Sequence, residues 1–277
     1  PKDNLSILGL AKKVATGFSR ITIPSSSAER GRWASSEREK LGRILRLKPV
    51  RSTGPWTVAI TKSKGVESFS YLFRMENGLD ASGVLVKTIG GPASSPATIV
   101  LDDRGKKQAG AAVSERVNRG ERVLALDLVF YGESWGKIGE GPFFGPVSPG
   151  LYQQFLHAVG DRPLGLEAAQ LIEIAKWLRG RPGVESVRVE STGIRNQVVA
   201  LAAAALEPQL FSEVVVHQGM RSLGYLLEKP VDYLDAAELF CLDFYKEFDL
   251  DRLEAIAAPT KIKVERYVED SPKEPKS

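Results

Sequence analysis

Cysteine and histidine are scarce in this sequence, and their scarcity excludes several kinds of site. The chain has one cysteine, Cys241, so it has no internal disulfide and no cysteine-based zinc site. Its two histidines, His157 and His217, are far apart and lack the spacing of metal ligands. The glycine-containing segment 141–146 (GPFFGP) has neither the lysine nor the strand–helix setting of a phosphate-binding loop. We therefore expect no metal and no cofactor.

Long apolar runs and basic tracts are absent as well. The longest apolar run, at 198–206, is too short to cross a membrane. The net charge is +4, but the basic residues are interspersed with nearly as many acidic ones and form no tract with interleaved aromatic residues. The sequence therefore predicts neither membrane nor nucleic-acid binding. It carries no signal peptide as it stands, and cysteine scarcity is common to cytoplasmic and exported bacterial proteins, so the localisation stays open.

Apolar runs alternate with amphipathic stretches over the second half of the chain. Such alternation predicts an α/β protein with a mostly parallel central sheet, helices on both faces and an antiparallel N-terminal hairpin. The parallel strands are expected at 97–103, 122–128, 184–191 and 212–219, with a last candidate at 260–269, and the antiparallel ones within 57–88. The expected organisation is an N-terminal helical extension or linker at 1–50, the main domain at 51–268 and a polar tail at 269–277.

Four stretches of this domain resemble the α/β-hydrolase fold, in the acetyl xylan esterase-like family that occurs in multidomain bacterial carbohydrate esterases. Residues 76–106 resemble the early hairpin and the strand whose end supplies part of the oxyanion hole. Residues 120–134 (GERVLALDLVFYGES) are similar to a strand and loop ending in Asp-x-x-Gly-x-Gly-x-Ser, although the first glycine is missing. Residues 191–208 (STGIRNQVVALAAAALEP) resemble the nucleophile turn and its helix, and residues 243–265 resemble the segment before the penultimate strand.

The resemblance implies a Ser–His–Asp hydrolase, yet the nucleophile position holds no nucleophile. A nucleophile elbow places the serine of Gly-x-Ser-x-Gly between a strand and a helix. Alignment of Ala200–Leu201 with the Ala-Leu pair usual after that turn puts Ile194 at the nucleophile position. A shift of one residue puts Gly193 or Arg195 there instead, and none of the three side chains can attack a carbonyl group.

The other members of a triad are equally hard to find. Ser191 and Thr192 match the nucleophile only after a further shift, and we prefer to interpret either hydroxyl as the N-cap of the following helix. The resemblance implies that Asp270 or Glu269 takes the place of the family's acid, but the family's histidine comes later than any histidine here. An alternative set has Ser191 or Ser134 attacking with His217 as base, although a structural histidine is the plainer interpretation.

A few charged and aromatic residues are candidates for binding a substrate. Arg104 follows a strand in the segment 102–107 (DDRGKK), which predicts a charged cleft, an oxyanion-binding loop or simply a solvated turn. Arg195 at a helix N-terminus would bind a carboxylate or uronic acid, or else form a surface ion pair. Tyr131 and Trp135 would contribute to an aromatic sugar platform, or else pack within their loop.

Taken together, these features predict an acetyl xylan esterase-like domain that has lost its triad. Because the fold is retained and the chain opens on Pro1 without an initiator methionine, we expect it to accompany an N-terminal catalytic domain in a longer chain. Its role would be to support that domain or to shape its site for a carbohydrate ester. Two alternatives remain: an active carboxylester hydrolase with a relocated nucleophile and base, and a non-catalytic carbohydrate-binding module.

Overall fold

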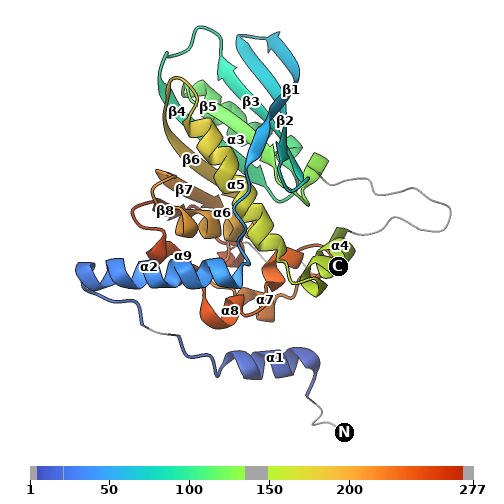
Figure 1. Cartoon of the computed structure of the whole chain (residues 1–277), viewed down its shortest axis with the longest axis vertical. Helices are drawn as coiled ribbons and strands as arrows, with labels where there is room; N and C mark the ends of the chain where they lie inside the picture. The colour runs from blue at the N-terminus through green and yellow to red at the C-terminus, as the bar shows by residue number, and fades with distance from the viewer. Residues whose placement is uncertain (1–4, 21, 135–148, 271–277) are drawn as a thin grey trace, which may run out of the picture.

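A mixed β-sheet runs through the computed structural model, which describes residues 5–20, 22–134 and 149–270. In this part of the chain the sheet has eight strands in the order β1-β2-β3-β5-β4-β6-β7-β8 (Figure 1). The first three strands and β5 pair in antiparallel fashion, whereas β5, β4, β6, β7 and β8 are parallel. The strands are β1 (Ser52–Ser63), β2 (Val66–Met75), β3 (Asp80–Thr88), β4 (Ser95–Asp102), β5 (Arg122–Asp127), β6 (Val184–Thr192), β7 (Glu213–His217) and β8 (Lys261–Val264).

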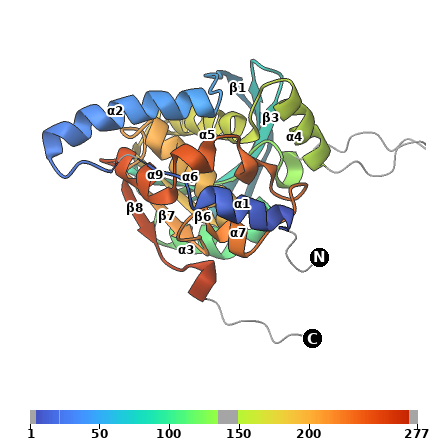
Figure 2. The same ribbon diagram turned by 90° about the horizontal axis from the view of Figure 1, so that it is seen from below.

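Helices cover both faces of this sheet (Figure 2). One face packs against α3 (Gly110–Asn118) through a small cluster that contains Val100, Val117 and Val123. The other face carries the main core beneath α2 (Ser27–Ile44), α5 (Pro163–Arg179), α6 (Ile194–Leu206) and α9 (Leu250–Ile256). The predicted fold class, a mostly parallel sheet with helices on both faces and an antiparallel start, is confirmed.

Helix α6 lies at the centre of the molecule, and its composition explains how it fits there. All its residues from Asn196 to Leu206 are buried, against the sheet on one side and α5, α9 and α2 on the others. Five alanines keep the helix narrow enough for close approach on every side. A helix that is apolar all round is typical of a fully enclosed element.

The described residues before position 51 form two helices with different surroundings. In α2, Leu41 and Leu45 are completely buried in the main core. Arg38 of the same helix donates to the carbonyl oxygens of Ala205 (2.8 Å) and Ile256 (3.1 Å), at the C-terminal ends of α6 and α9. A cation suits this position because it satisfies carbonyl groups that have no partner within their own helices.

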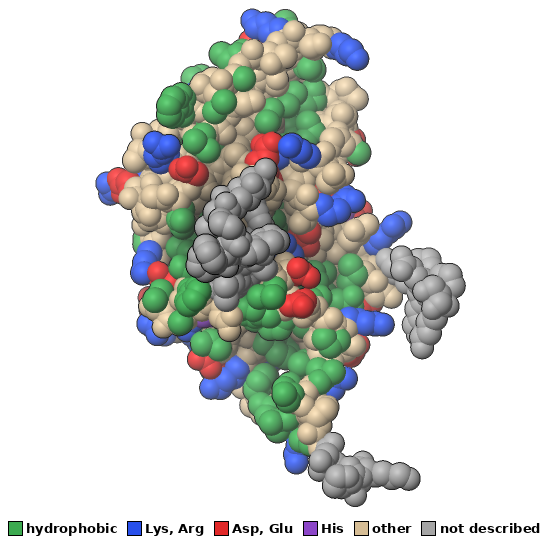
Figure 3. All heavy atoms as spheres, turned by 90° about the vertical axis from the view of Figure 1, so that its right-hand side faces the viewer, with side chains coloured by type: hydrophobic (Ala, Val, Ile, Leu, Met, Phe, Trp, Pro, Cys, Tyr) green, Lys and Arg blue, Asp and Glu red, His purple; other side chains and the backbone are tan. Residues whose placement is uncertain are grey.

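By contrast, α1 (Ile7–Ala15) lies at the edge of the molecule beside α7 (Tyr225–Glu228) (Figure 1). The apolar side chains of α1 gather with other apolar groups at one end of the surface in Figure 3. The remaining short helices are α4 (Pro149–Ala158) and α8 (Phe244–Glu247). None of the helices in the described ranges combines the length and the apolar character needed to cross a membrane. Of the predicted polar tail, 269 and 270 belong to a 3₁₀ turn at Val268–Asp270, and 271–277 lie outside the described residues.

Candidate functional site

The sharp turn between β6 and α6 is the position at which the sequence alignment predicted a nucleophile. The strand ends at Thr192, the turn residue is Gly193 with φ of 101°, and the helix begins at Ile194. The alignment put the nucleophile position at Ile194, which is the first residue of α6, and Gly193 is the neighbour that a shift of one residue allows. Glycine suits the turn because a residue with a side chain adopts such a φ only under strain.

The carboxylate of Asp103, which directly follows β4, lies over Gly193. A Cβ atom added at Gly193 would come within 2.1 Å of Asp103 Oδ2 and 2.2 Å of its Cγ. The carboxylate accepts hydrogen bonds from the backbone N–H of Arg195 (3.0 Å) and from the backbone N–H and side-chain amide of Asn196 (2.8 and 2.9 Å). Asp103 therefore binds N–H groups that have no acceptor within the first turn of α6.

This arrangement overturns the prediction that the hydroxyl of Ser191 or Thr192 caps α6, because the N-cap residue is Gly193. The Oγ of Ser191 is buried and has no hydrogen-bond partner within the described ranges, and the helix N-terminus takes its acceptor from a different strand end. A carboxylate is as good an N-cap acceptor as a hydroxyl, and it also interacts favourably with the positive end of the helix dipole. The cap is thus provided by a residue distant in sequence.

Burial raises the pKa of Asp103 from 3.8 to about 6, against the opposing effect of its backbone hydrogen bonds and of Arg195. Because the folded pKa is the higher one, the folded state holds this proton more tightly than the unfolded state. The protonated Asp103 therefore makes its full contribution to stability below pH 3.8, and this contribution is lost as the pH rises through about 6. The negative charge of Glu238 acts in the same direction as burial.

We expect this pH dependence to disappear in Asp103→Asn, which cannot titrate. The free energy of unfolding of the wild type, relative to that of D103N, should fall by about 2 kcal/mol between pH 4 and pH 7, a value discounted for the partial exposure of the carboxylate. Urea denaturation of both proteins across this range measures the difference. Parallel curves for the two proteins would contradict the raised pKa.

A buried polar cluster lies next to Asp103 at the same end of the sheet. Arg195 Nε donates to Glu238 Oε1, and the hydroxyl of Tyr131 donates to the same oxygen at 3.1 Å. The guanidinium of Arg195 stacks over the Tyr131 ring with 4.3 Å between its central carbon and the ring centroid. Glu238, in a 3₁₀ turn at Ala237–Phe240, is completely buried. The structure thus brings together Arg195 and Tyr131, two of the predicted substrate-binding residues, around an internal carboxylate.

Glu167, on α5, adds a third carboxyl group to this region. Its side chain is fully buried, and neither of its oxygens has a hydrogen-bond partner among the described residues. Burial, followed by the negative charge of Glu238, raises the pKa of Glu167 well above its usual value of 4.5. The carboxyl groups of Asp103, Glu167 and Glu238 therefore lie around Arg195, whose positive charge opposes the rise in the pKa of Asp103 and of Glu167.

The two candidate serines are held in separate places. Ser191 is completely buried in β6. Ser134 Oγ donates to the carbonyl oxygen of Asp127 (3.0 Å) and accepts from the backbone N–H of Ser82 (3.0 Å), so it ties a loop to β3. Ser191 precedes Thr192, the partner of His217 in the sheet register, so the side chains of Ser191 and His217 project from opposite faces.

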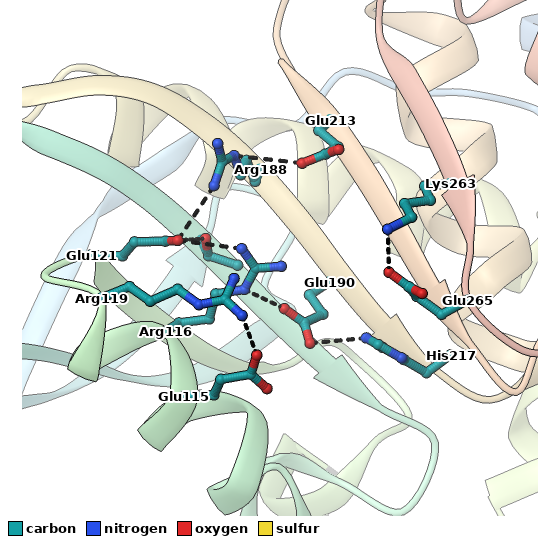
Figure 4. Close-up of polar contacts among 11 residues, drawn as sticks. Glu115, Arg116, Arg119, Glu121, Arg188, Glu190, Glu213, His217, Lys263 and Glu265 are labelled. Carbon is teal, nitrogen blue, oxygen red and sulfur yellow. Dashed lines mark hydrogen bonds and ion pairs between the residues drawn. The ribbon is translucent and has the colours of Figure 1, made fainter.

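His217 belongs to a network of charged groups on the α3 side of the sheet (Figure 4). Its Nε2 is 3.0 Å from Glu190 Oε1, and the other oxygen of Glu190 accepts from Arg116 Nε at 2.6 Å. The bond to Glu190 raises the pKa of His217. Asp270 is bound by Arg221 at 2.8 Å, so the structure does not bring the candidate triad members Ser191, His217 and Asp270 together.

The last two predicted binding residues do not contribute to the cluster. Arg104 is well exposed and bonds to Asp102 through its guanidinium, at 3.0 Å from both Nε and Nη2, which is the plainer of the interpretations from sequence. Trp135 lies outside the described residues. In the described ranges no group of three or more His, Cys, Asp and Glu side chains could hold a metal ion.

Comparison with known proteins places this geometry in a known fold. No protein-family model and no curated protein matches the sequence. A solved structure of a Bacteroides fragilis protein assigned to the acetyl xylan esterases superposes with a TM-score of 0.77 and 13% identity, over 95% of this chain and 76% of that one. An acetyl xylan esterase from Paenibacillus sp. R4 superposes with a TM-score of 0.56 and 11% identity, over 94% of this chain and 93% of that one. A methylesterase superposes with a TM-score of 0.63 and 14% identity. The matched region is 95% of this chain but only 55% of the methylesterase chain.

The fold is that of an acetyl xylan esterase-like α/β-hydrolase. In α/β-hydrolases the nucleophile lies on a strand-to-helix turn, and the oxyanion hole uses the next N–H together with one from the loop after a neighbouring strand. The β6–α6 turn and the loop between β4 and α3 take these places here. The α/β-hydrolase fold therefore has Gly193 at its nucleophile turn and Asp103 in the loop opposite.

Sequence reasoning missed the buried carboxyl groups around Arg195. Glu167 had a signal, because it lies at helical spacing with Leu171, Ile174 and Leu178, which are all buried. A glutamate in such a row indicates a buried acid. Glu238 had no such signal in the sequence, because it follows an irregular segment. Asp103 was noted only as one charged residue in a polar loop.

Proposed function

We propose that this chain is a non-catalytic, acetyl xylan esterase-like domain of a larger carbohydrate esterase. The observation that carries the proposal is the β6–α6 turn, where Gly193 has no side chain and the carboxylate of Asp103 lies in its place. Both oxygens of that carboxylate already accept hydrogen bonds from α6. These bonds reduce the nucleophilicity of the carboxylate, and neither His157 nor His217 is among its partners.

Two further observations support the absence of catalysis. A serine hydrolase needs its hydroxyl and its imidazole within hydrogen-bond reach of each other. The hydroxyl of Ser191 has no hydrogen-bond partner among the described residues, and Ser134 and His217 are held in two different networks. Arg195, the candidate for binding an acidic sugar, is already neutralised by Glu238 inside the protein. Ser134, His217 and Arg195 thus each have a structural task.

The proposed role is to support a catalytic domain that precedes this one in the same chain, or to shape that domain's site for a carbohydrate ester. The solved methylesterase is an instance of a longer protein in which this fold forms only a part. The scaffold of the domain is complete around α6, so it offers a rigid body to a neighbour without a working nucleophile of its own.

We expect p-nitrophenyl acetate to be hydrolysed by this chain at the rate of a protein-free blank. Ser191→Ala, Ser134→Ala and His217→Ala should give the same rate as the wild type, because none of these residues is in a catalytic arrangement. Initial rates at pH 7 to 8 with each purified protein provide the measurement, and circular dichroism checks that every variant is folded.

An active hydrolase with a relocated nucleophile gives a different pattern. Turnover well above the blank that falls at least about 100-fold in His217→Ala and in one serine variant would overturn the proposal. If the activity of all three variants falls in proportion to their content of folded protein, the loss of activity would instead reflect lower stability.

A further inference from the structure

An open pocket of about 390 Å³ lies at the C-terminal end of α2. Its walls come from α2, from α8 with the residues just before it, and from Arg162, the residue that precedes α5 (Figure 1). We call it the α2 pocket. Arg43 and Arg46 line it from α2 and the turn that follows, and both side chains are exposed. None of its lining residues belongs to the β6–α6 turn or to the buried cluster next to that turn.

The charges in the α2 pocket do not balance. Five cations line it, but only two carboxylates do, those of Asp243 and Glu247. Lys40 pairs with Glu247, and the Nζ of Lys246 lies 4.0 Å from Asp243 and 3.8 Å from Glu247. The two lysines therefore neutralise the two carboxylates. Three guanidinium groups remain without a carboxylate partner among the described residues, those of Arg43, Arg46 and Arg162.

Arg162 also carries a donor that the protein leaves unused. Its Nη1 donates to the carbonyl oxygen of Asp161 at 2.9 Å, whereas its Nε is buried and has no hydrogen-bond partner within the described ranges. A buried donor without an acceptor lowers stability, so such groups are rare and call for an explanation. This one belongs to a side chain that lines the α2 pocket, where an acceptor from outside the chain completes its hydrogen bonding.

Arg46 holds its place in the pocket against the preference of its backbone. The N–H of Arg46 donates to the carbonyl oxygen of Arg43 at 3.2 Å, and that of Leu47 donates to Gly42 at 2.9 Å, which closes the C-terminal end of α2. Position 46 in this motif has φ of 51°, a conformation that glycine adopts without strain and that a side chain disfavours. The helix end alone would therefore favour glycine, and the arginine indicates a task for its guanidinium.

We propose that the α2 pocket binds a small molecule with two or more oxyanion groups, carboxylate or phosphate, through Arg43, Arg46 and Arg162. A guanidinium presents parallel N–H donors that match the two oxygens of such a group, and three guanidiniums favour a multiply charged ligand over a single small ion. Ile44 and Leu242 give the pocket an apolar wall against which the carbon skeleton of the ligand packs. The volume is that of a site for a small metabolite.

The test is isothermal titration calorimetry of the wild type with citrate and, separately, with tripolyphosphate, at an ionic strength held constant with sodium chloride. We expect saturable binding of at least one of the two at one site per chain. Binding of citrate alone identifies a carboxylate ligand, and binding of tripolyphosphate alone identifies a phosphate ligand. Ester hydrolysis is not measured, so the proposal can fail while the domain remains non-catalytic, and the reverse also holds.

Arg46→Gly separates a role in binding from a role in the fold. The variant should weaken binding of the anion at least about tenfold, because charge-assisted hydrogen bonds are lost. Its Tm should be unchanged or higher than that of the wild type, because glycine relieves the strain at φ of 51°. Arg43→Gln should weaken binding by a similar factor.

Lys64→Gly is the matched control for Arg46→Gly. Lys64 has φ of 50° in the turn between β1 and β2, far from α2 in Figure 1, and it does not line the pocket. The substitution removes one positive charge from the same backbone conformation, so the affinity for either anion should stay within about twofold of the wild type. Absence of saturable binding of both anions to the wild type would overturn the proposal. Equal losses of affinity in R46G and K64G would also overturn it, because they would show an effect of net charge alone.

Discussion

Replacement of Lys106 with methionine is expected to lower the free energy of unfolding by about 3–5 kcal/mol. The side chain of Lys106 is buried, and its Nζ lies 2.8 Å from Asp127 Oδ2, 2.6 Å from Glu133 Oε2 and 2.8 Å from Ser82 Oγ. Methionine keeps the length of the side chain and removes its charge. The carboxylate of Asp127, only 1% exposed, would then be buried without its cation, and removal of one partner of such a pair is strongly destabilising.

Lys107 provides the matched control for this variant. It also pairs with Glu133, at 2.9 Å, but its side chain is 74% exposed. Because an exposed ion pair contributes little, Lys107→Met should leave the free energy of unfolding close to that of the wild type. Urea denaturation at pH 7 measures both values. Similar losses from K106M and K107M would contradict the view that the buried ion pair holds the loop after β4 to the loop after β5.

The loop after β4, which holds Asp103 and Lys106, makes contacts that the sequence could not predict. The strands and helices follow from apolar periodicity, which is a local property, and the α/β-hydrolase fold follows from their order. The polar turn before a helix that starts near Ile194 was predicted for the same reason. The contact between Asp103 and Asn196, by contrast, exists because β4 and β6 are neighbours in the sheet, and 81 residues separate the end of one strand from the start of the other.

The roles of the individual polar residues depended on such contacts. Ser134 and His217 have the side chains of a hydrolase, and only their partners, Ser82 with Asp127 and Glu190 with Arg116, assign them to structural networks. A serine or a histidine can have a catalytic or a structural role, and residue type alone does not decide which. The neighbour in space decides between them, and that neighbour is set by the topology of the sheet rather than by spacing along the chain.

The packing of residues 1–50 against the main domain leads to the second large effect. Gly165, in the first turn of α5, lies against the end of α2: a Cβ there would come within 2.0 Å of the backbone carbonyl oxygen of Leu45. The overlap is with backbone, which cannot rotate away, and Leu45 itself is completely buried. Gly165→Ala is therefore expected to cost about 3 kcal/mol, at the upper end of what overpacking usually costs, because one helix must shift relative to the other.

Gly31→Ala in α2 is the matched control, with an effect of opposite sign. A Cβ at Gly31 would meet nothing within 4 Å, so the substitution adds only helix propensity and should raise the free energy of unfolding by about 0.5–1 kcal/mol. Urea denaturation of the two variants beside the wild type measures the pair. A loss in G165A no larger than a few tenths of a kcal/mol would mean that α2 yields without strain and is a detachable extension. A large loss in G165A together with a gain in G31A would show that α2 is docked on the hydrolase core in solution.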